Sequence, residues 1–330
     1  MHPLCHPEPL DYAAAKPLLV LGINSAGRSA RGSEARATNS PTVPFFRILT
    51  VALAAALAAC TSTAPSSRGL TVIATMSTLA SIASAVAGPG VPVSTLVPVG
   101  ASPENYQPTP ADIERLRSAG VLIANGAGLE SWLEHTIQAA AAPHLVKVVC
   151  TDGLTIIDGN PHLWMDPELA RAYVTKIRDA LISADPSGAD GYRSRAADYD
   201  KTLVRLVAST RAKIATIPKA NREMIIFHDA FPYYNRRFGI RTLAAVELSP
   251  GREPNPSELA SIVKLARAHH VRAVFAEPQF SPRLMQTLAQ SAGITKVAVL
   301  YDDTLGTGSQ TTDYVGLIDY DTNTIVNALR

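Results

Sequence analysis

From Leu70 onward, short apolar runs alternate along the chain with longer stretches in which apolar residues recur at helical spacing. The short runs predict buried strands and the longer stretches predict helices. Strands are expected at residues 70–74, 91–97, 121–124, 145–149, 224–227, 242–246, 273–276 and 297–300. Helices are expected at residues 78–87, 129–140, 167–184, 192–217, 255–269, 282–291 and 314–329, with another that begins at Thr109. Because strands alternate with helices, we expect an α/β fold whose parallel sheets are covered on both faces.

The stretch at residues 192–217 is the longest uninterrupted helical pattern in the chain. A helix of about 26 residues extends about 39 Å, because each residue adds 1.5 Å. This length predicts one rigid helix, residues 190–218, that joins a first lobe of residues 70–189 to a second lobe of residues 219–330. Ligands of parallel sheets bind beyond the carboxyl ends of the strands, so we expect the site in the cleft between the lobes.

The N-terminal region, residues 1–59, is expected to lie outside both lobes. After an upstream extension, Arg47 precedes a short apolar run at 48–56 that ends in small residues. This pattern indicates a secretory signal, and the run is too short to span a membrane comfortably. Its closing sequence, Leu-Ala-Ala-Cys, resembles the bacterial lipobox, which implies cleavage before Cys60 and a lipid on its sulfur; an ordinary signal peptide is the alternative. Residues 60–69 would then be a lipidated cysteine and a flexible tether at the extracytoplasmic face of the cell membrane.

Charge and cysteine content narrow the classes of partner. The formal net charge is +2 and the chain has no basic run, so nucleic acid is not an expected partner. Once Cys60 carries a lipid, Cys150 is the one thiol left beyond the signal. Cys150 ends a predicted strand, and we interpret it as a small core residue.

The sequence Asn160 to Pro167, Asn-Pro-His-Leu-Trp-Met-Asp-Pro, holds one histidine between two prolines. Pro161 fixes its own φ and favours an extended Asn160, so His162 is expected on a stiff loop. Asp166 is a predicted N-cap, with Pro167 at the first helical position. A histidine held in this way suits metal ligation or catalysis, although packing beneath the nearby tryptophan is an equally good explanation from this stretch alone.

Four polar side chains are expected in loops at the cleft. Glu104 lies in a proline-rich loop of the first lobe, which also carries His162, whereas His228 and Asp303 follow predicted strands of the second lobe. Two imidazoles and two carboxylates form a ligand set suited to Zn²⁺, Mn²⁺ or Fe²⁺. Taken singly, the two acids are also explained as solvated loop residues and His228 as a strand end.

Five blocks of sequence, in order, resemble the zinc and manganese substrate-binding proteins of ABC transporters, the zinc-uptake and metal-binding adhesin-like family. The blocks are residues 103–110 (PENYQPTP), 160–167 (NPHLWMDP), 227–231 (FHDAF), 276–281 (AEPQFS) and 301–306 (YDDTLG). The resemblance extends over nearly the whole chain from Leu70 to Arg330. It implies a monomeric, lipid-anchored receptor that captures a divalent metal ion and delivers it to an ABC permease and its ATPase.

The resemblance also implies which residues bind the ion. His162 matches the second ligand of the family, His228 the third, and Asp303 the last, with Asp302 as a less favoured neighbour. The first position departs from the family pattern, because Glu104 stands where the family normally has histidine. A second departure is the absence of the His- and Asp-rich loop that many zinc-type members insert before the second ligand.

The expected metal is Zn²⁺, with Mn²⁺ as the alternative. The blocks around His228 and Glu277 favour zinc, whereas the second carboxylate, Glu104, favours harder ions such as Mn²⁺. Glu277 either orients a ligand from behind or caps the helix expected to begin at Pro282.

Two other functions remain open from the residues. One is a surface metallohydrolase in which Glu104 is a general base. The other is a siderophore or vitamin receptor of similar architecture. The sequence contains no HExxH pair, nucleophile elbow or glycine-rich phosphate loop, so we expect no enzyme activity.

Overall fold

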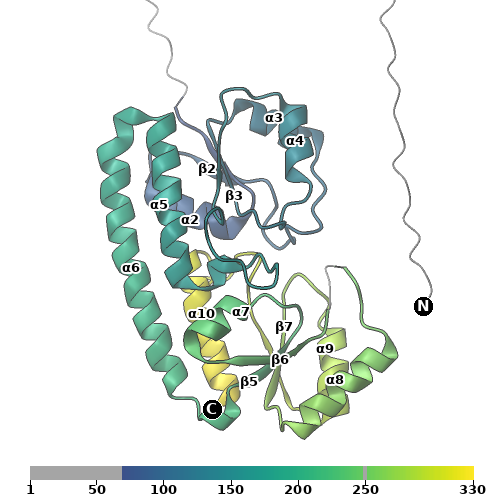
Figure 1. Ribbon diagram of the computed structural model, residues 1–330. Coiled ribbons are helices and arrows are strands. Elements are labelled where there is room, and N and C mark those ends of the chain that lie inside the picture. Colours follow the sequence, from purple (N-terminus) through teal and green to yellow (C-terminus); the bar gives the residue numbers. More distant parts are fainter. Residues whose placement is uncertain (1–68, 248–250) are drawn as a thin grey trace, which may run out of the picture. The chain divides into compact units, whose positions relative to one another are not determined.

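The computed structural model describes residues 69–247 and 251–330, all of which belong to one unit of the chain (Figure 1). The predicted signal peptide and Cys60 lie outside the described residues. The first sheet has the order β2-β1-β3-β4 and consists of β1 (Val72–Ala74), β2 (Val93–Thr95), β3 (Val121–Ala124) and β4 (Val146–Val149). The second has the order β6-β5-β7-β8 and consists of β5 (Glu223–Ile226), β6 (Arg241–Ala245), β7 (Ala273–Ala276) and β8 (Lys296–Val299). All strand pairs are parallel, so the predicted α/β fold with two parallel sheets is confirmed.

The two sheets share one strand order, in which the first strand of each lobe lies between the second and the third. Connections therefore leave β5 and β7 in opposite directions, and a crevice opens beyond the carboxyl ends of these neighbouring strands. His228 follows β5 and Glu277 follows β7. The sheet order alone therefore places these two side chains next to each other at the expected position of a ligand.

Helices cover the sheets and connect the lobes. They are α2 (Ser77–Ala87), α3 (Pro110–Ser118), α4 (Leu133–Ala140), α5 (Pro167–Ala184), α6 (Ala189–Ala215), α7 (Pro232–Phe238), α8 (Pro256–Ala268), α9 (Arg283–Ala292) and α10 (Tyr314–Leu329). Short 3₁₀ helices lie at Leu163–Met165, Pro186–Gly188 and Lys219–Asn221. None of the described helices combines the length and the apolarity needed to cross a membrane.

Two helices differ from the sequence-based expectation. α4 begins at Leu133 instead of residue 129, because residues 127–132 form turns, in which the N–H groups of Leu129 and Leu133 donate to carbonyls three residues back. α7 was not predicted, since its 7 residues are too few to show a helical period.

The long helix α6 runs along both lobes, as Figure 1 shows. It packs against α2 and α5 of the first lobe and against α10 and α7 of the second. The buried residues of α6 join one continuous hydrophobic core that reaches from β1 and α5 to β5 and α10. Two smaller clusters lie outside this core, one among β1, α3 and α4 and the other beneath α8 and α9. The lobes are therefore packed together along α6, and Cys150, 0 % exposed, belongs to the shared core as predicted.

The shared core predicts that the middle of α6 is essential for stability. Leu203 is 0 % exposed, whereas its neighbour Val204 is 45 % exposed. We expect Leu203→Ala to lower the free energy of unfolding by about 2–5 kcal/mol, because it removes buried methyl groups and leaves a cavity. Val204→Ala should change it by less than about 0.5 kcal/mol. Urea unfolding of both variants, measured without metal, tests this; equal effects would show that α6 does not anchor the two lobes.

Candidate metal centre

His162 comes from the loop between β4 and α5, and its side chain is held by its own neighbours. Its backbone N–H donates to Asn160 Oδ1 at 3.0 Å, and its Nδ1 lies 3.0 Å from the same oxygen. Asn160 is itself fixed, because Tyr233 donates its hydroxyl to the Asn160 carbonyl at 2.7 Å. With Nδ1 turned toward Asn160, the other ring nitrogen, Nε2, faces the cleft.

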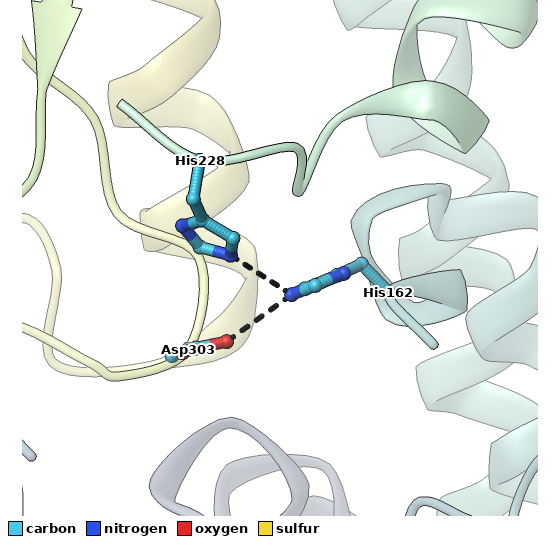
Figure 2. A group of neighbouring side chains, drawn as sticks. All are labelled: His162, His228 and Asp303. Atoms are coloured by element: carbon cyan, nitrogen blue, oxygen red, sulfur yellow. Dashed lines mark hydrogen bonds and ion pairs between the residues drawn. The ribbon is translucent and has the colours of Figure 1, made fainter. Parts of the chain in front are cut away.

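Three predicted ligands meet in this cleft (Figure 2). His162 Nε2 lies 3.0 Å from His228 Nε2 and 3.5 Å from Asp303 Oδ1. All three side chains are buried, and one ligand atom from each lies within 4.8 Å of the others. They come from three loops of two lobes, and sequence reasoning had named all three.

The fourth predicted ligand, Glu104, lies at the edge of this group. Its Oε1 is 4.0 Å from His162 Nε2, and its side chain is 15 % exposed. The loop that carries it is anchored, because Trp132 Nε1 donates to the Pro103 carbonyl at 2.8 Å and Tyr106 donates to Asp112 at 2.8 Å. Asp112 and Thr109 form the capping box that begins α3. Glu104 therefore faces the cleft from a well-supported loop, beside a cavity of about 430 Å³ that His162 and His228 also line.

Burial and neighbouring charges shift the pKa values of the two predicted carboxylate ligands, Glu104 and Asp303. Burial, together with the charge of Asp303, raises the pKa of the Glu104 carboxyl. Burial would also raise the pKa of Asp303, but the two imidazoles and the Ser102 hydroxyl outweigh it and lower that pKa. Ser102 donates to Asp303 Oδ2 at 3.0 Å, whereas Asp303 Oδ1 has no hydrogen-bond partner among the described residues. An ionised, buried oxygen without a partner that faces two imidazoles is a position for a cation.

Glu277 lies behind His228 and not at a helix cap. Both of its carboxylate oxygens are 2.8 Å from His228 Nδ1, and Oε1 also accepts the His228 backbone N–H at 3.1 Å. Burial alone would lower the pKa of His228, but Glu277, Asp302 and Asp303 raise it well above its ordinary value. The sequence left two positions open for Glu277, behind a ligand or at the cap of the helix near Pro282. The structure places it behind the predicted ligand His228.

An ion pair ties the His162 loop to the second lobe. Asp166 caps α5 as predicted, since its Oδ1 accepts the Glu168 N–H at 3.0 Å. Arg237, from α7, donates through Nε to both oxygens of Asp166 at 3.0 and 2.9 Å. Asn160 also donates to the carbonyl of Asp229, directly after His228. Sequence reasoning missed these contacts, because α7 was not expected.

The spacing of the ligand atoms suits a divalent transition-metal ion. Two nitrogens about 2.0–2.1 Å from a tetrahedral ion lie about 3.3 Å apart. The two imidazole nitrogens lie 3.0 Å apart, and His162 Nε2 lies 3.5 Å from Asp303 Oδ1, so both distances are close to this value. Two imidazoles and buried carboxylates are also the donor types that divalent first-row metals prefer.

Comparison with known proteins identifies the family of the chain. A family model described as the periplasmic component A of a zinc-uptake complex matches residues 72–328. The chain belongs to this family. The family resemblance expected from the five sequence blocks is therefore confirmed, and with it the general function of a metal-binding receptor of an ABC importer.

Curated relatives and solved structures cover most of the chain. The chain is 30 % identical to a manganese-binding lipoprotein of Halalkalibacterium halodurans over 291 residues. This alignment covers 86 % of the chain and 97 % of that protein. The chain is 29 % identical over 262 residues to an iron-binding protein of Yersinia pestis, over 77 % and 84 % of the two chains. A manganese-bound periplasmic metal-binding protein from Candidatus Liberibacter asiaticus superposes with a TM-score of 0.72 at 25 % identity, over 79 % of this chain and 100 % of that one.

A periplasmic zinc-binding protein from Treponema pallidum has the same fold, with a TM-score of 0.74 at 23 % identity over 79 % of this chain and 99 % of that one. These proteins are named for manganese, iron and zinc. Family membership therefore fixes the class of ligand, a transition-metal ion, and leaves the choice of ion to the residues of the site.

The Asp166–Arg237 ion pair predicts a large effect of one arginine and a small effect of its neighbour. The Asp166 side chain is 1 % exposed, so Arg237→Ala would leave a buried carboxylate without its partner. We expect a loss of about 1–3 kcal/mol in the free energy of unfolding. Arg236→Ala removes only a cation–π contact with Tyr233, worth at most about 1 kcal/mol. Urea unfolding measures both, and equal losses would show that the ion pair does not join the lobes.

Proposed function

We propose that this protein captures one divalent transition-metal ion between its lobes, with His162, His228, Asp303 and Glu104 as ligands, and delivers it to an ABC permease. The observation that carries the ligand assignment is the meeting of His162 Nε2, His228 Nε2 and Asp303 Oδ1, at 3.0 and 3.5 Å, from three separate loops. Glu104 completes the set from the open side, where its Oε1 lies 4.0 Å from His162 Nε2.

Four protein ligands would close a tetrahedral shell. Structural zinc sites have such closed shells, whereas catalytic zinc sites keep one position for water or substrate. A closed shell suits storage and delivery of the ion and leaves no position for a hydrolytic water. The family is also one of receptors, and its curated relatives are described as substrate-binding lipoproteins. We therefore propose binding and transport, without catalysis, as the function of the centre.

We propose Zn²⁺ as the preferred ion. Two imidazole nitrogens favour zinc over manganese, because zinc binds nitrogen ligands more strongly along the Irving–Williams series. The hydrogen bond from His228 Nδ1 to Glu277 strengthens this preference, since it makes the imidazole a better donor. Mn²⁺ is the second candidate, because Glu104 and Asp303 offer two hard oxygens and because the relative in Halalkalibacterium halodurans is named for manganese.

The place of action follows from the same relatives. Several of them are described as lipoproteins, and the matching family is described as periplasmic. We propose that this protein is held at the outer face of the cytoplasmic membrane by a lipid at Cys60, and that it meets its permease and ATPase as a monomer.

The ligand assignment predicts which histidines are required. Purified wild-type protein should bind close to one equivalent of zinc, and His162→Ala and His228→Ala should lose most of it. At a free zinc concentration 100-fold above Kd, wild-type protein should gain about 2.7 kcal/mol of stability, a gain that both variants should lack. His135→Ala, on the exposed face of α4, is the control. Elemental analysis and thermal unfolding are the measurements; full zinc binding by either ligand variant would reject the site.

Glu104 provides a separate test of the fourth ligand. If its carboxylate binds the ion, Glu104→Ala should weaken zinc affinity at least about tenfold, the lower range for loss of a metal-site group. Glu104→His should keep zinc affinity and weaken manganese affinity, because an imidazole replaces a hard oxygen. Glu114→Ala, an exposed glutamate on α3, is the matched control. Competition with a chelator measures both affinities, and a change below twofold in Glu104→Ala would show that water, not Glu104, occupies that position.

A further inference from the structure

A second buried acid, Asp302, lies behind His228 on the side away from the proposed ion. Asp302 is 0 % exposed, and its Oδ2 is 3.7 Å from His228 Nδ1. Asp303, the next residue, faces the cleft instead, where its Oδ1 lies 3.5 Å from His162 Nε2. The two neighbouring aspartates therefore have different positions: one faces the cation site, and the other faces the back of a predicted ligand.

The backbone fixes this division between the two acids. Trp164, 0 % exposed, donates its Nε1–H to the Asp302 carbonyl at 3.0 Å. Asp302 Oδ1 in turn accepts the backbone N–H of Asp303 at 2.5 Å. Because both contacts hold the turn, Asp302 cannot exchange places with Asp303 without breaking them.

Gln279 connects Asp302 to Glu277. Its Nε2 donates to Glu277 Oε2 at 2.9 Å and to Asp302 Oδ1 at 3.1 Å. The amide nitrogen must face the two carboxylates, since the amide oxygen in that place would repel both. The contacts form a chain from Asp302 through Gln279 and Glu277 to His228 Nδ1. At the end of this chain, both Glu277 oxygens face one imidazole N–H.

We propose that Asp302 is a positioning residue that holds Glu277 against His228 and thereby favours zinc over manganese at the proposed metal centre. The inference rests on the proposed function, because it concerns the choice of ion at that site. A second observation supports it: Asp302 Oδ2 has no hydrogen-bond partner among the described residues and is directed at the His228 ring.

The selectivity follows from the chemistry of imidazole. A carboxylate that accepts the Nδ1–H bond fixes the tautomer and makes Nε2 a stronger donor to a metal. A stronger nitrogen donor benefits zinc more than manganese, because manganese lies at the weak end of the series and prefers oxygen. Asp302 adds a third oxygen near the same N–H, beside the two of Glu277, and keeps Glu277 aligned. Loss of Asp302 should therefore weaken zinc binding more than manganese binding.

The experiment compares Asp302→Asn with Asp158→Asn in the full-length protein. Asp158 is an exposed aspartate that lines the same cavity, so the control removes one charge near the site without touching His228. Dissociation constants for zinc and for manganese are measured by competition with a chelator. Asp302→Asn should weaken zinc binding by about 10- to 100-fold, the range for loss of such a supporting partner, and manganese binding by less than about threefold. Asp158→Asn should leave the ratio of the two constants unchanged.

A double-variant cycle tests whether Asp302 acts through Glu277. Residues on one path have non-additive effects, so Asp302→Asn should change the zinc affinity little in a Glu277→Gln background. Additive effects would overturn the proposed path. Gln279→Met, which cuts the amide bridge at a partly exposed residue, should reproduce the loss of zinc preference and serves if Asp302→Asn does not fold.

The outcomes separate this inference from the proposed function. If wild-type protein binds zinc tightly but Asp302→Asn and Gln279→Met keep its zinc-to-manganese ratio, the role of Asp302 is rejected and the metal centre stands. If wild-type protein binds neither ion, the proposed function itself is rejected, and the role of Asp302 falls with it.

Discussion

Two imidazole nitrogens lie 3.0 Å apart between the lobes, and the rest of the structure supports this contact. Neutral nitrogens at this distance repel each other unless a proton or a cation lies between them. Asp303 Oδ1 is buried, has no hydrogen-bond partner among the described residues and lies 3.5 Å from His162 Nε2, so a proton or a cation at this place would balance its charge as well. In the function proposed above, the bound ion offsets the cost of burying these polar groups, together with the hydrogen bonds of the two imidazoles to Asn160 and Glu277.

Such a contact requires lobes that keep their relative position to within a fraction of an ångström. The shared core along α6 provides this rigidity, because one face of each sheet packs on the same continuous apolar cluster. The pair between Asp166 and Arg237 adds a polar tie close to His162.

The sequence revealed the residues whose role depends on local rules. Asp166 was identifiable as an N-cap because it precedes a proline and a helical stretch, whereas His228 was singled out by its place in one of the five sequence blocks that resemble the family. The contact between His228 and Glu277 could not be predicted from local sequence, because the two residues are 49 positions apart and meet only through the pairing of β5 with β7. The same limit explains Asp302 and Asp303: a contact of the Asp302 carbonyl with Trp164, 138 positions away, helps to decide which acid faces the cleft.

The two nitrogens of His228 show how the fold combines these contributions. Nε2 faces the cleft and His162, while Nδ1 faces Glu277 and the buried acids behind it. Because β5 and β7 are neighbours, the sheet order brings Glu277 to Nδ1. Because α7 is tied to the His162 loop, the contact between the lobes brings His162 to Nε2. A change on the Nδ1 side therefore alters the strength of the Nε2 donor without moving it. If His228 binds the ion as we propose, the choice of ion is adjusted behind the ligand while the geometry of the cleft is preserved.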